Sequence, residues 1–284
     1  MRNKLYILLF NLPLLFTLNA QDIHQIRQFG DEQFRNGDYR LALKEYQRVL
    51  LFDNERVHND LYSKIAFIQY YSNEYEQAMR YFDYAIITER NDSLRFELML
   101  KKALCCFRMN NYLAALNELY DLPDPPGRFL QNKKNLYMGI CCFGMNDYEN
   151  SKGCFSALLD SLGIRNLEEV FNDFSRFNKK FRPGKAELMS MILPGLGQIY
   201  TGNVTDGLNS FLLISGVTIY SLVTAVNYAI IDGLLVLSSW FYRYYSGGFS
   251  NASDLAQKKL DRKKEEVYAE ILALIESNQL NLQE

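Results

Sequence analysis

The stretch Leu193-Pro194-Gly195-Leu196-Gly197-Gln198-Ile199-Tyr200-Thr201-Gly202 divides this chain of 284 residues into two unlike parts. A polar, tyrosine-rich region with helical periodicity precedes it, and the only long apolar run beyond the N-terminus follows it. Proline lacks a backbone N–H and glycine favours turns, so the stretch excludes one uninterrupted helix. Because its neighbours are apolar, we expect this broken backbone to lie at membrane depth, where it must be buried in protein or face water.

The apolar run is long enough to cross a membrane. Residues 207–231 include no charged residue, and after Asp232-Gly233 the run resumes over 234–242. One span needs about 20 residues, so two spans fit. We expect a helical hairpin with spans near 207–225 and 228–246; the alternative is a single tilted span over 207–231.

Two acidic residues belong to this region. We expect Asp206 to cap the first span. Asp232 would lie a turn inside the second span, where an acidic group is costly and typical of a functional site. Alternatively, Asp232 only accepts hydrogen bonds from the broken backbone of Gly195–Gln198 or from Asn209.

The glycine-rich stretch resembles the motif of small bacterial two-helix membrane-hairpin domains, which read P-G-x-G-Q-x-Y-x-G ahead of an apolar helix pair. The residues that carry the resemblance are Pro194, Gly195, Gly197, Gln198, Tyr200, Gly202 and Asp206. It implies a membrane module over residues 186–248 and attaches no catalytic chemistry to it. Together with Asp232, these residues form the candidate membrane site, in which glycines allow close helix contact and Gln198 and Tyr200 supply polar groups.

A four-fold repeat lies on the N-terminal side of this stretch, with tyrosines 36 or 37 residues apart. The four copies are Gly37-Asp38-Tyr39, Asn73-Glu74-Tyr75, Asn110-Asn111-Tyr112 and Asn146-Asp147-Tyr148. Small residues lie nine positions before and three after each Tyr, and a large residue lies seven after it. These positions hold Gly30, Ala42 and Tyr46; Ala66, Ala78 and Phe82; Ala103, Ala115 and Leu119; and Gly139, Ser151 and Phe155. Each copy is therefore predicted to be two closely packed antiparallel helices joined by a turn at the Gly or Asn.

This pattern is similar to that of the tetratricopeptide repeat family. The resemblance implies four helical-hairpin units over residues 21–163, stacked as a right-handed superhelix whose first helices line a concave face. The period exceeds the usual length of about 34 residues, and residues 121–127 make an irregular joint between the third and fourth units. Solenoids expose extended concave surfaces, so the resemblance implies binding of a protein or peptide partner.

Each predicted first helix has an aromatic residue at the same position, five residues before the Tyr of the repeat motif. These register aromatics are Phe34, Tyr70, Phe107 and Phe143. They either pack adjacent units together or form the walls of a peptide groove, with charged residues of the same helices as polar contacts. The candidate groove consists of Arg27, Asp31, Phe34, Phe67, Tyr70, Phe107, Arg108, Lys133 and Phe143.

Two further segments flank the repeats. Residues 1–20 have a basic start, a short apolar run and a small residue at the end, which predicts a cleaved secretory signal peptide. Residues 164–185 are predicted to form a helix, with capping-box spacing at Asn166 and Glu169. This helix either caps the array or meets lipid headgroups through its basic end.

The C-terminal residues 249–284 are predicted to form a separate amphipathic helix capped by Asn251 or Ser253. Its basic face is either solvated or attracted to anionic headgroups. The expected fold class is thus all-α, with a tetratricopeptide-like solenoid, a transmembrane helical hairpin and a C-terminal helix.

Composition narrows the range of functions. The net charge of −2 argues against nucleic-acid binding, which usually requires a basic excess. We find no metal-ligand spacing, no phosphate-binding loop and no nucleophile–base pair, so we expect no metal, no cofactor and no enzymatic activity. The five cysteines include Cys105-Cys106 and Cys141-Cys142 and are expected to be buried apolar residues. A bridge between Cys105 and Cys141 remains an alternative in an oxidising compartment.

These patterns favour a membrane-anchored scaffold of the bacterial cell envelope that binds envelope proteins or peptides and contacts membrane lipids. The signal peptide predicts that the repeats face the periplasm, and an even number of spans would return the C-terminal helix to the same side. The alternative is a function of the membrane module itself, such as lipid handling or passage of small solutes around Asp232 and Gln198, regulated by the repeats.

Overall fold

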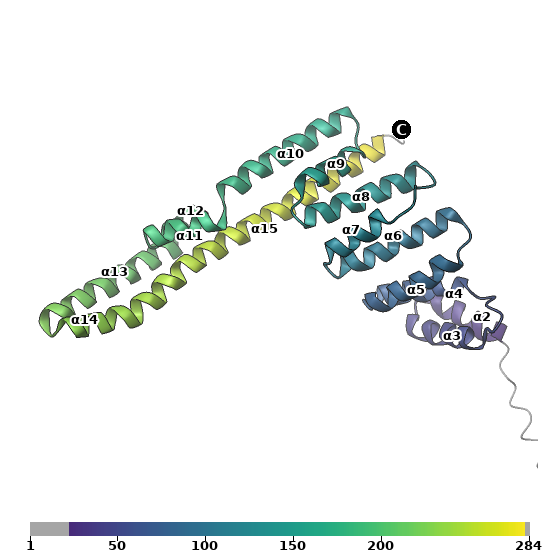
Figure 1. Cartoon of the computed structure of the whole chain (residues 1–284), viewed down its shortest axis with the longest axis horizontal. Coiled ribbons are helices and arrows are strands. Elements are labelled where there is room, and N and C mark those ends of the chain that lie inside the picture. The colour runs from purple at the N-terminus through teal and green to yellow at the C-terminus, as the bar shows by residue number, and fades with distance from the viewer. Residues whose placement is uncertain (1–22, 282–284) are drawn as a thin grey trace, which may run out of the picture. The chain divides into compact units, whose positions relative to one another are not determined.

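The computed structural model describes residues 23–281, and their regular structure consists entirely of helices (Figure 1). The all-α fold class predicted from the sequence is therefore confirmed. The helices form two compact units, one ending at Ala157 and the other beginning at Leu158. The signal peptide expected over residues 1–20 lies outside the described residues.

Four helical hairpins make up the first unit, in agreement with the repeat seen in the sequence. Each hairpin pairs a first helix with the second helix that follows it. The hairpins are α2 (Ile23–Arg35) with α3 (Tyr39–Phe52), α4 (Asp60–Tyr71) with α5 (Tyr75–Thr88), α6 (Asp92–Arg108) with α7 (Tyr112–Tyr120), and α8 (Arg128–Gly144) with α9 (Tyr148–Ser156).

Each hairpin turns at the Gly or Asn of the repeated motif, which adopts the left-handed backbone conformation. The four residues are Gly37 (φ 80°), Asn73 (φ 63°), Asn110 (φ 58°) and Asn146 (φ 64°). The next residue donates its backbone N–H to a carbonyl five positions back, as Asp38 does to Gln33 at 2.9 Å. This is the Schellman pattern of helix ends, which Gly and Asn favour. The Asp38 side chain then accepts a hydrogen bond from the Leu41 N–H at 3.2 Å and caps the following helix.

The small and large positions of the repeat meet inside each hairpin. A Cβ atom added to Gly30 would lie 3.0 Å from the ring of Tyr46, and one added to Gly139 would lie 2.6 Å from the ring of Phe155. Both rings are fully buried. The close approach of the two helices therefore requires a small residue at this position, as the sequence predicts.

The second unit contains the glycine-rich stretch and everything after it. Its elements are α10 (Ser161–Lys180), α11 (Pro183–Ile192), α12 (Leu196–Thr201), α13 (Val204–Asn227), α14 (Ile230–Val236), the π-helix η2 (Leu237–Phe241) and α15 (Tyr242–Asn281). Helix α10 begins earlier than predicted because Asp160 accepts the N–H of Gly163 at 2.7 Å and caps it. The capping role predicted for Asn166 and Glu169 is therefore wrong, since both lie inside the helix.

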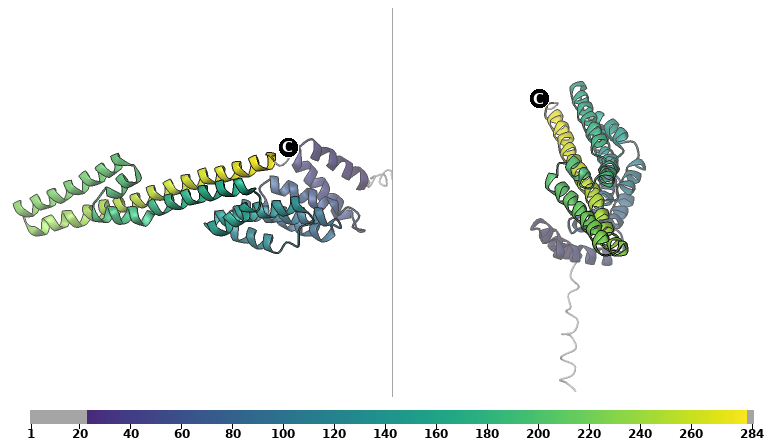
Figure 2. Two further views of the ribbon diagram at one scale, coloured as in Figure 1. Left: turned by 90° about the horizontal axis from the view of Figure 1, so that it is seen from above. Right: turned by 90° about the vertical axis from the view of Figure 1, so that its left-hand side faces the viewer.

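Helix α13 is long and apolar enough to cross a membrane, judged by its length and composition, and no other helix of residues 23–281 meets the same test. It packs against a return arm made of α14, η2 and the start of α15 (Figures 1 and 2). Helices α10 and α11 run alongside the rest of α15.

The return arm and the C-terminal helix are one continuous element. Helix α15 passes through Asn251 and Ser253 without a break, so the separate helix expected to begin there is wrong. Ala252 and Ala256 are fully buried against Ala186 of α11. This close packing holds α15 in register across the position where the sequence suggested a boundary.

Candidate functional site

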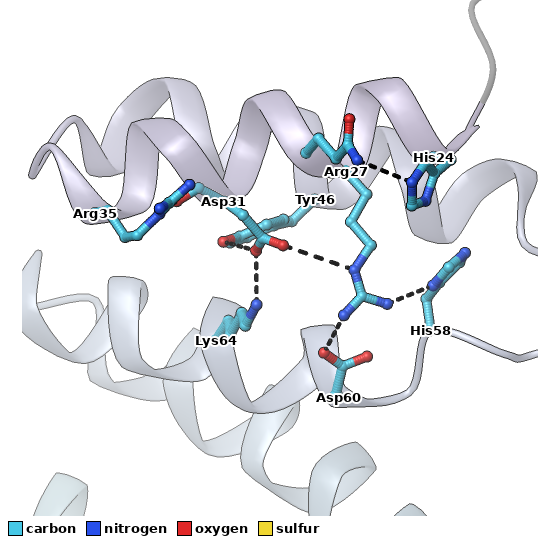
Figure 3. Close-up of polar contacts among 9 residues, drawn as sticks. His24, Arg27, Asp31, Arg35, Tyr46, His58, Asp60 and Lys64 are labelled. Carbon is cyan, nitrogen blue, oxygen red and sulfur yellow. Dashed lines mark hydrogen bonds and ion pairs between the residues drawn. The ribbon is translucent and has the colours of Figure 1, made fainter.

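Charged side chains of successive first helices are bonded to one another in the first unit (Figure 3). Asp31 of α2 accepts hydrogen bonds from Lys64 of α4 at 2.6 Å and from the Tyr46 hydroxyl at 2.7 Å. Burial opposes ionisation of Asp31, but these two bonds hold the pKa of its carboxyl below the usual value. Burial and the bond to Asp31 raise the pKa of Tyr46 in turn.

Arg27 makes the second connection between α2 and α4. Its guanidinium donates to a carboxylate oxygen of Asp60 at 2.7 Å and lies 2.7 Å from Nδ1 of His58 (Figure 3). Asp60 is the first residue of α4, and His58 lies just before it. Arg27 and Asp31, which the sequence analysis placed in a groove, are thus already engaged with the neighbouring hairpin.

The next two first helices continue this row of contacts. Lys101 of α6 lies with its Nζ 3.9 Å from the ring centroid of Phe67 on α4. Lys133 of α8 pairs with Glu97 of α6 at 3.2 Å, and its Nζ also lies 4.4 Å from the ring centroid of Phe129. We call the surface carrying these side chains the first-helix face. Its residues are Arg27, Asp31, Asp60, Lys64, Phe67, Glu97, Lys101 and Lys133.

Lys101 differs from the other cations of the first-helix face. Arg27, Lys64 and Lys133 each pair with a carboxylate, whereas no carboxylate of the described residues forms an ion pair with Lys101. Burial lowers the pKa of Lys101, and the nearby charge of Lys133 adds to this effect while Glu97 opposes it. An anion placed beside Lys101 would therefore offset the free-energy cost of burying its positive charge.

Most aromatic residues of the predicted groove pack against the turns of their own hairpins. In every hairpin, the register aromatic packs edge-to-face on the Tyr of its own turn motif, with ring centroids 5.5 or 5.6 Å apart. The pairs are Phe34 with Tyr39, Tyr70 with Tyr75, Phe107 with Tyr112, and Phe143 with Tyr148. Arg108 is exposed at the same end of its hairpin and donates to the Tyr75 hydroxyl at 3.1 Å. The structure thus brings Arg27, Asp31, Phe67 and Lys133 to the first-helix face and the other five predicted residues to the turns.

Four members of the first-helix face were missed by the sequence analysis. They carry no motif of their own and are Asp60, Lys64, Glu97 and Lys101. For Asp60, Lys64 and Glu97 the signal is a spacing close to the repeat period, because each lies 33 or 36 positions from the opposite charge with which it pairs. Lys101 has no such signal, since it forms no ion pair among the described residues. Opposite charges separated by one repeat would have indicated ties between neighbouring first helices.

The glycine-rich motif of the second unit joins three helices around Gln198. This side chain is fully buried. Its Oε1 accepts the Ser190 hydroxyl of α11 at 2.8 Å, and its Nε2 donates to the Gly248 carbonyl of α15 at 2.6 Å. The Ser190 oxygen in turn accepts the Gly197 N–H at 2.9 Å. The broken backbone thus obtains its polar partners inside the protein, as buried polar groups require.

The glycines of the motif are needed for close approach of the backbone. A Cβ atom on Gly195 would lie 2.0 Å from the carbonyl oxygen of Gly207, and one on Gly197 would lie 2.0 Å from that of Ala186. Gly195 and Gly202 also have φ values of 89° and 98°, which other residues rarely adopt. Pro194 lies between the end of α11 at Ile192 and Gly195, which makes the close contact with Gly207.

The two acidic residues of the predicted membrane site lie apart from this network. Asp206 is exposed in the first turn of α13, where Asn203 occupies the cap position. Asp232 is exposed in the first turn of α14. The side-chain hydrogen bonds of Gln198 run to Ser190 and Gly248, so the motif and Asp232 do not share one polar site.

The possible metal ligands among the described residues are dispersed, and the cysteines are mostly buried. No group of three or more His, Cys, Asp or Glu side chains among residues 23–281 lies close enough together to hold a metal ion. All five cysteines are unbridged, so the alternative of a Cys105–Cys141 disulfide is wrong for this structure. Burial raises the pKa of Cys105 and Cys141 to about 12 and that of Cys142 to about 11, which makes these thiols poor nucleophiles.

Comparison with known proteins gives no match: no protein-family profile fits the chain, and no curated protein is significantly similar to it.

Proposed function

We propose that this protein is a membrane-anchored scaffold of the cell envelope, with tetratricopeptide-like hairpins that face the periplasm and bind a protein or peptide. The first-helix face is the observation that carries this proposal. Its charges are fixed by neighbouring helices yet remain within reach of a partner, since the side chains of Asp31 and Lys64 are 32% and 31% exposed. Preorganised charges of both signs favour specific recognition of an extended chain.

Lys101 is the position at which the proposed partner is expected to place a carboxylate. The ammonium group is held over Phe67 and lacks an ion-pair partner among the described residues. A carboxylate on the partner would form a charge-assisted hydrogen bond with it, which is stronger than a neutral one.

The experiment places a photo-crosslinking residue at position 101 in the full chain in native membranes, and mass spectrometry identifies the product. Position 44 on α3, which is exposed on a second helix, is the matched control. A partner that crosslinks from 101 and not from 44 is then tested with Lys101→Gln and Lys44→Gln. Loss of the charge-assisted bond should weaken binding about tenfold for Lys101→Gln only. Equal binding by both variants would reject the first-helix face as the binding surface.

The proposed anchor is the hairpin of α13 and the return arm. Helix α13 has 24 residues, which corresponds to about 36 Å and exceeds a hydrocarbon core of about 30 Å. Its contact with the return arm uses small residues, and the Ser221 hydroxyl donates to the Gly233 carbonyl at 2.7 Å. Such packing is typical of helices in membranes. In this proposal the repeats and the end of α15 lie on the same side of the membrane.

The alternative of lipid handling or solute passage has less support. Passage around Gln198 and Asp232 would require polar groups that face a shared path. The amide of Gln198 is buried and bonded within the protein, whereas Asp232 is exposed near the tip of the hairpin.

A further inference from the structure

Three lysines gather around two aromatic rings where the glycine-rich motif meets α10 and α15. The rings of Phe181 and Tyr200 lie in contact, with centroids 5.5 Å apart. The Nζ atoms of Lys259 and Lys180 lie 4.0 and 5.3 Å from the Phe181 centroid, and that of Lys185 lies 5.0 Å from the Tyr200 centroid. We call this group the lysine collar.

No carboxylate among residues 23–281 forms an ion pair with any of the three lysines of the lysine collar, so its positive charge is not balanced within that part of the chain. Lys259 donates one hydrogen bond, to the Thr201 carbonyl at 3.0 Å, which leaves two of its three N–H groups available. The backbone carbonyl of Lys180 accepts the Tyr200 hydroxyl, which fixes the aromatic rings between the lysines. Three like charges held at one place favour an anion as ligand.

The lysine collar lies outside the hydrocarbon core when the hairpin is inserted as proposed. Gly248 lies 18 positions beyond Ile230, the start of the return arm, which is about 27 Å and close to the hydrocarbon thickness. Lys259 lies 11 positions beyond Gly248, about 16 Å farther along the helix, so the lysine collar is on the headgroup side of the hydrocarbon core.

The surface next to the lysine collar suits acyl chains. Ile199 of α12 is 40% exposed, and Val204 and Leu208 of α13 are both 51% exposed. These apolar side chains belong to the segment that leads from the collar into the hairpin. An anion with an attached hydrocarbon tail would contact both surfaces at once, which a soluble anion cannot do.

We propose that Lys180, Lys185 and Lys259 bind the phosphate of an anionic phospholipid, with Phe181 and Tyr200 as the wall of the site and its acyl chains along α12 and α13. This site rests on the proposed insertion of the hairpin into the membrane. It is independent of the repeats, so it is tested without the protein partner.

The test uses the full chain in detergent micelles with an equimolar mixture of dioleoyl phosphatidylglycerol and dioleoyl phosphatidylcholine, and native mass spectrometry counts the lipids retained. Wild type is expected to retain phosphatidylglycerol preferentially. Each lysine near an anionic surface contributes about fivefold in affinity, so replacing all three by Gln should reduce this preference by up to about 100-fold. Replacing the three by Arg keeps the charge and should keep the preference.

A matched control separates a defined site from diffuse attraction. It replaces the three exposed cations Lys179, Lys258 and Arg262 by Gln, which removes the same charge from α10 and α15. An equal loss in this control, or equal retention of the two lipids by wild type, overturns the proposal. Displacement of the lipid by millimolar inorganic phosphate assigns the site to a free anion and rejects the lipid. Labelling at position 227 as well as at 175 and 277 in the topology test below would reject insertion of the hairpin. If phosphatidylglycerol is still selected in that case, only the anchor fails.

Discussion

Replacing Gly139 by Ala tests how closely the two helices of the fourth hairpin approach. The added Cβ would lie 2.6 Å from Cε1 of Phe155, whereas an ordinary contact begins at 3.4 Å. The ring must therefore move by about 0.8 Å inside a close-packed core, and overpacking of this kind costs about 1–3 kcal/mol. Ala also favours a helix over Gly by about 1 kcal/mol. The net effect should be a loss of up to about 2 kcal/mol in the free energy of unfolding.

Gly153 in α9 provides the matched control. It is also helical, but a Cβ added there meets nothing within 4 Å. Gly153→Ala should therefore stabilise the protein by about 0.4–1 kcal/mol, because only the backbone effect remains. The two substitutions thus have the same chemistry and opposite expected signs.

The assay is unfolding of the full chain by urea in detergent, with circular dichroism as the signal that monitors unfolding. Phe155→Leu in the Gly139→Ala background removes the ring and should recover part of the loss, so that the two changes are not additive. If Gly139→Ala stabilises the protein as much as Gly153→Ala, the predicted repeat register is refuted.

Three further predictions address other parts of the molecule. Asp31→Asn should lower the free energy of unfolding of the first unit at pH 7. Because the pKa of Asp31 is lowered from 3.8 in the folded state, the difference in stability between wild type and variant should be present above pH 3.8 and disappear as the pH falls through the folded-state pKa. Acid unfolding of wild type and variant measures this difference. Gln198→Leu should leave the Gly248 carbonyl without its buried partner and cost about 1–3 kcal/mol in detergent unfolding, and unchanged stability would contradict this. Single cysteines at Ser175, Asn227 and Ser277, in a chain without native cysteines, should react with an impermeant thiol reagent in intact spheroplasts at 175 and 277 but not at 227. Labelling at 175 with protection at 277 would support a single span instead.

The turns of the repeat could be predicted from the sequence because their cause is local. Asn73, Asn110 and Asn146 recur at the position that needs a positive φ, and Gly37 supplies the same property in the first hairpin. The helix–helix register was also predictable, since small and large residues alternate at fixed distances from each turn. These signals act within a few residues and repeat four times.

The partners of charged and polar groups could not be predicted in the same way. The sequence shows that the helical backbone is interrupted near Gln198. The carbonyl that accepts a hydrogen bond from the Gln198 side chain belongs to Gly248, which lies 50 positions away. Nothing in the local pattern distinguishes that carbonyl from others. Similarly, Gly247-Gly248 suggests the end of a helix, yet packing of α15 against α11 maintains the helix through both residues.

The uninterrupted course of α15 has a mechanical consequence. Its 40 residues form a rod of about 60 Å, rooted beside the apolar hairpin. A tilt of roughly 10° at that root would carry the far end through about 10 Å, because a helix transmits rotation along its whole axis. If the hairpin is inserted as proposed, a change in the thickness or lateral pressure of the surrounding lipid would thereby become a displacement that is largest at the far end of α15.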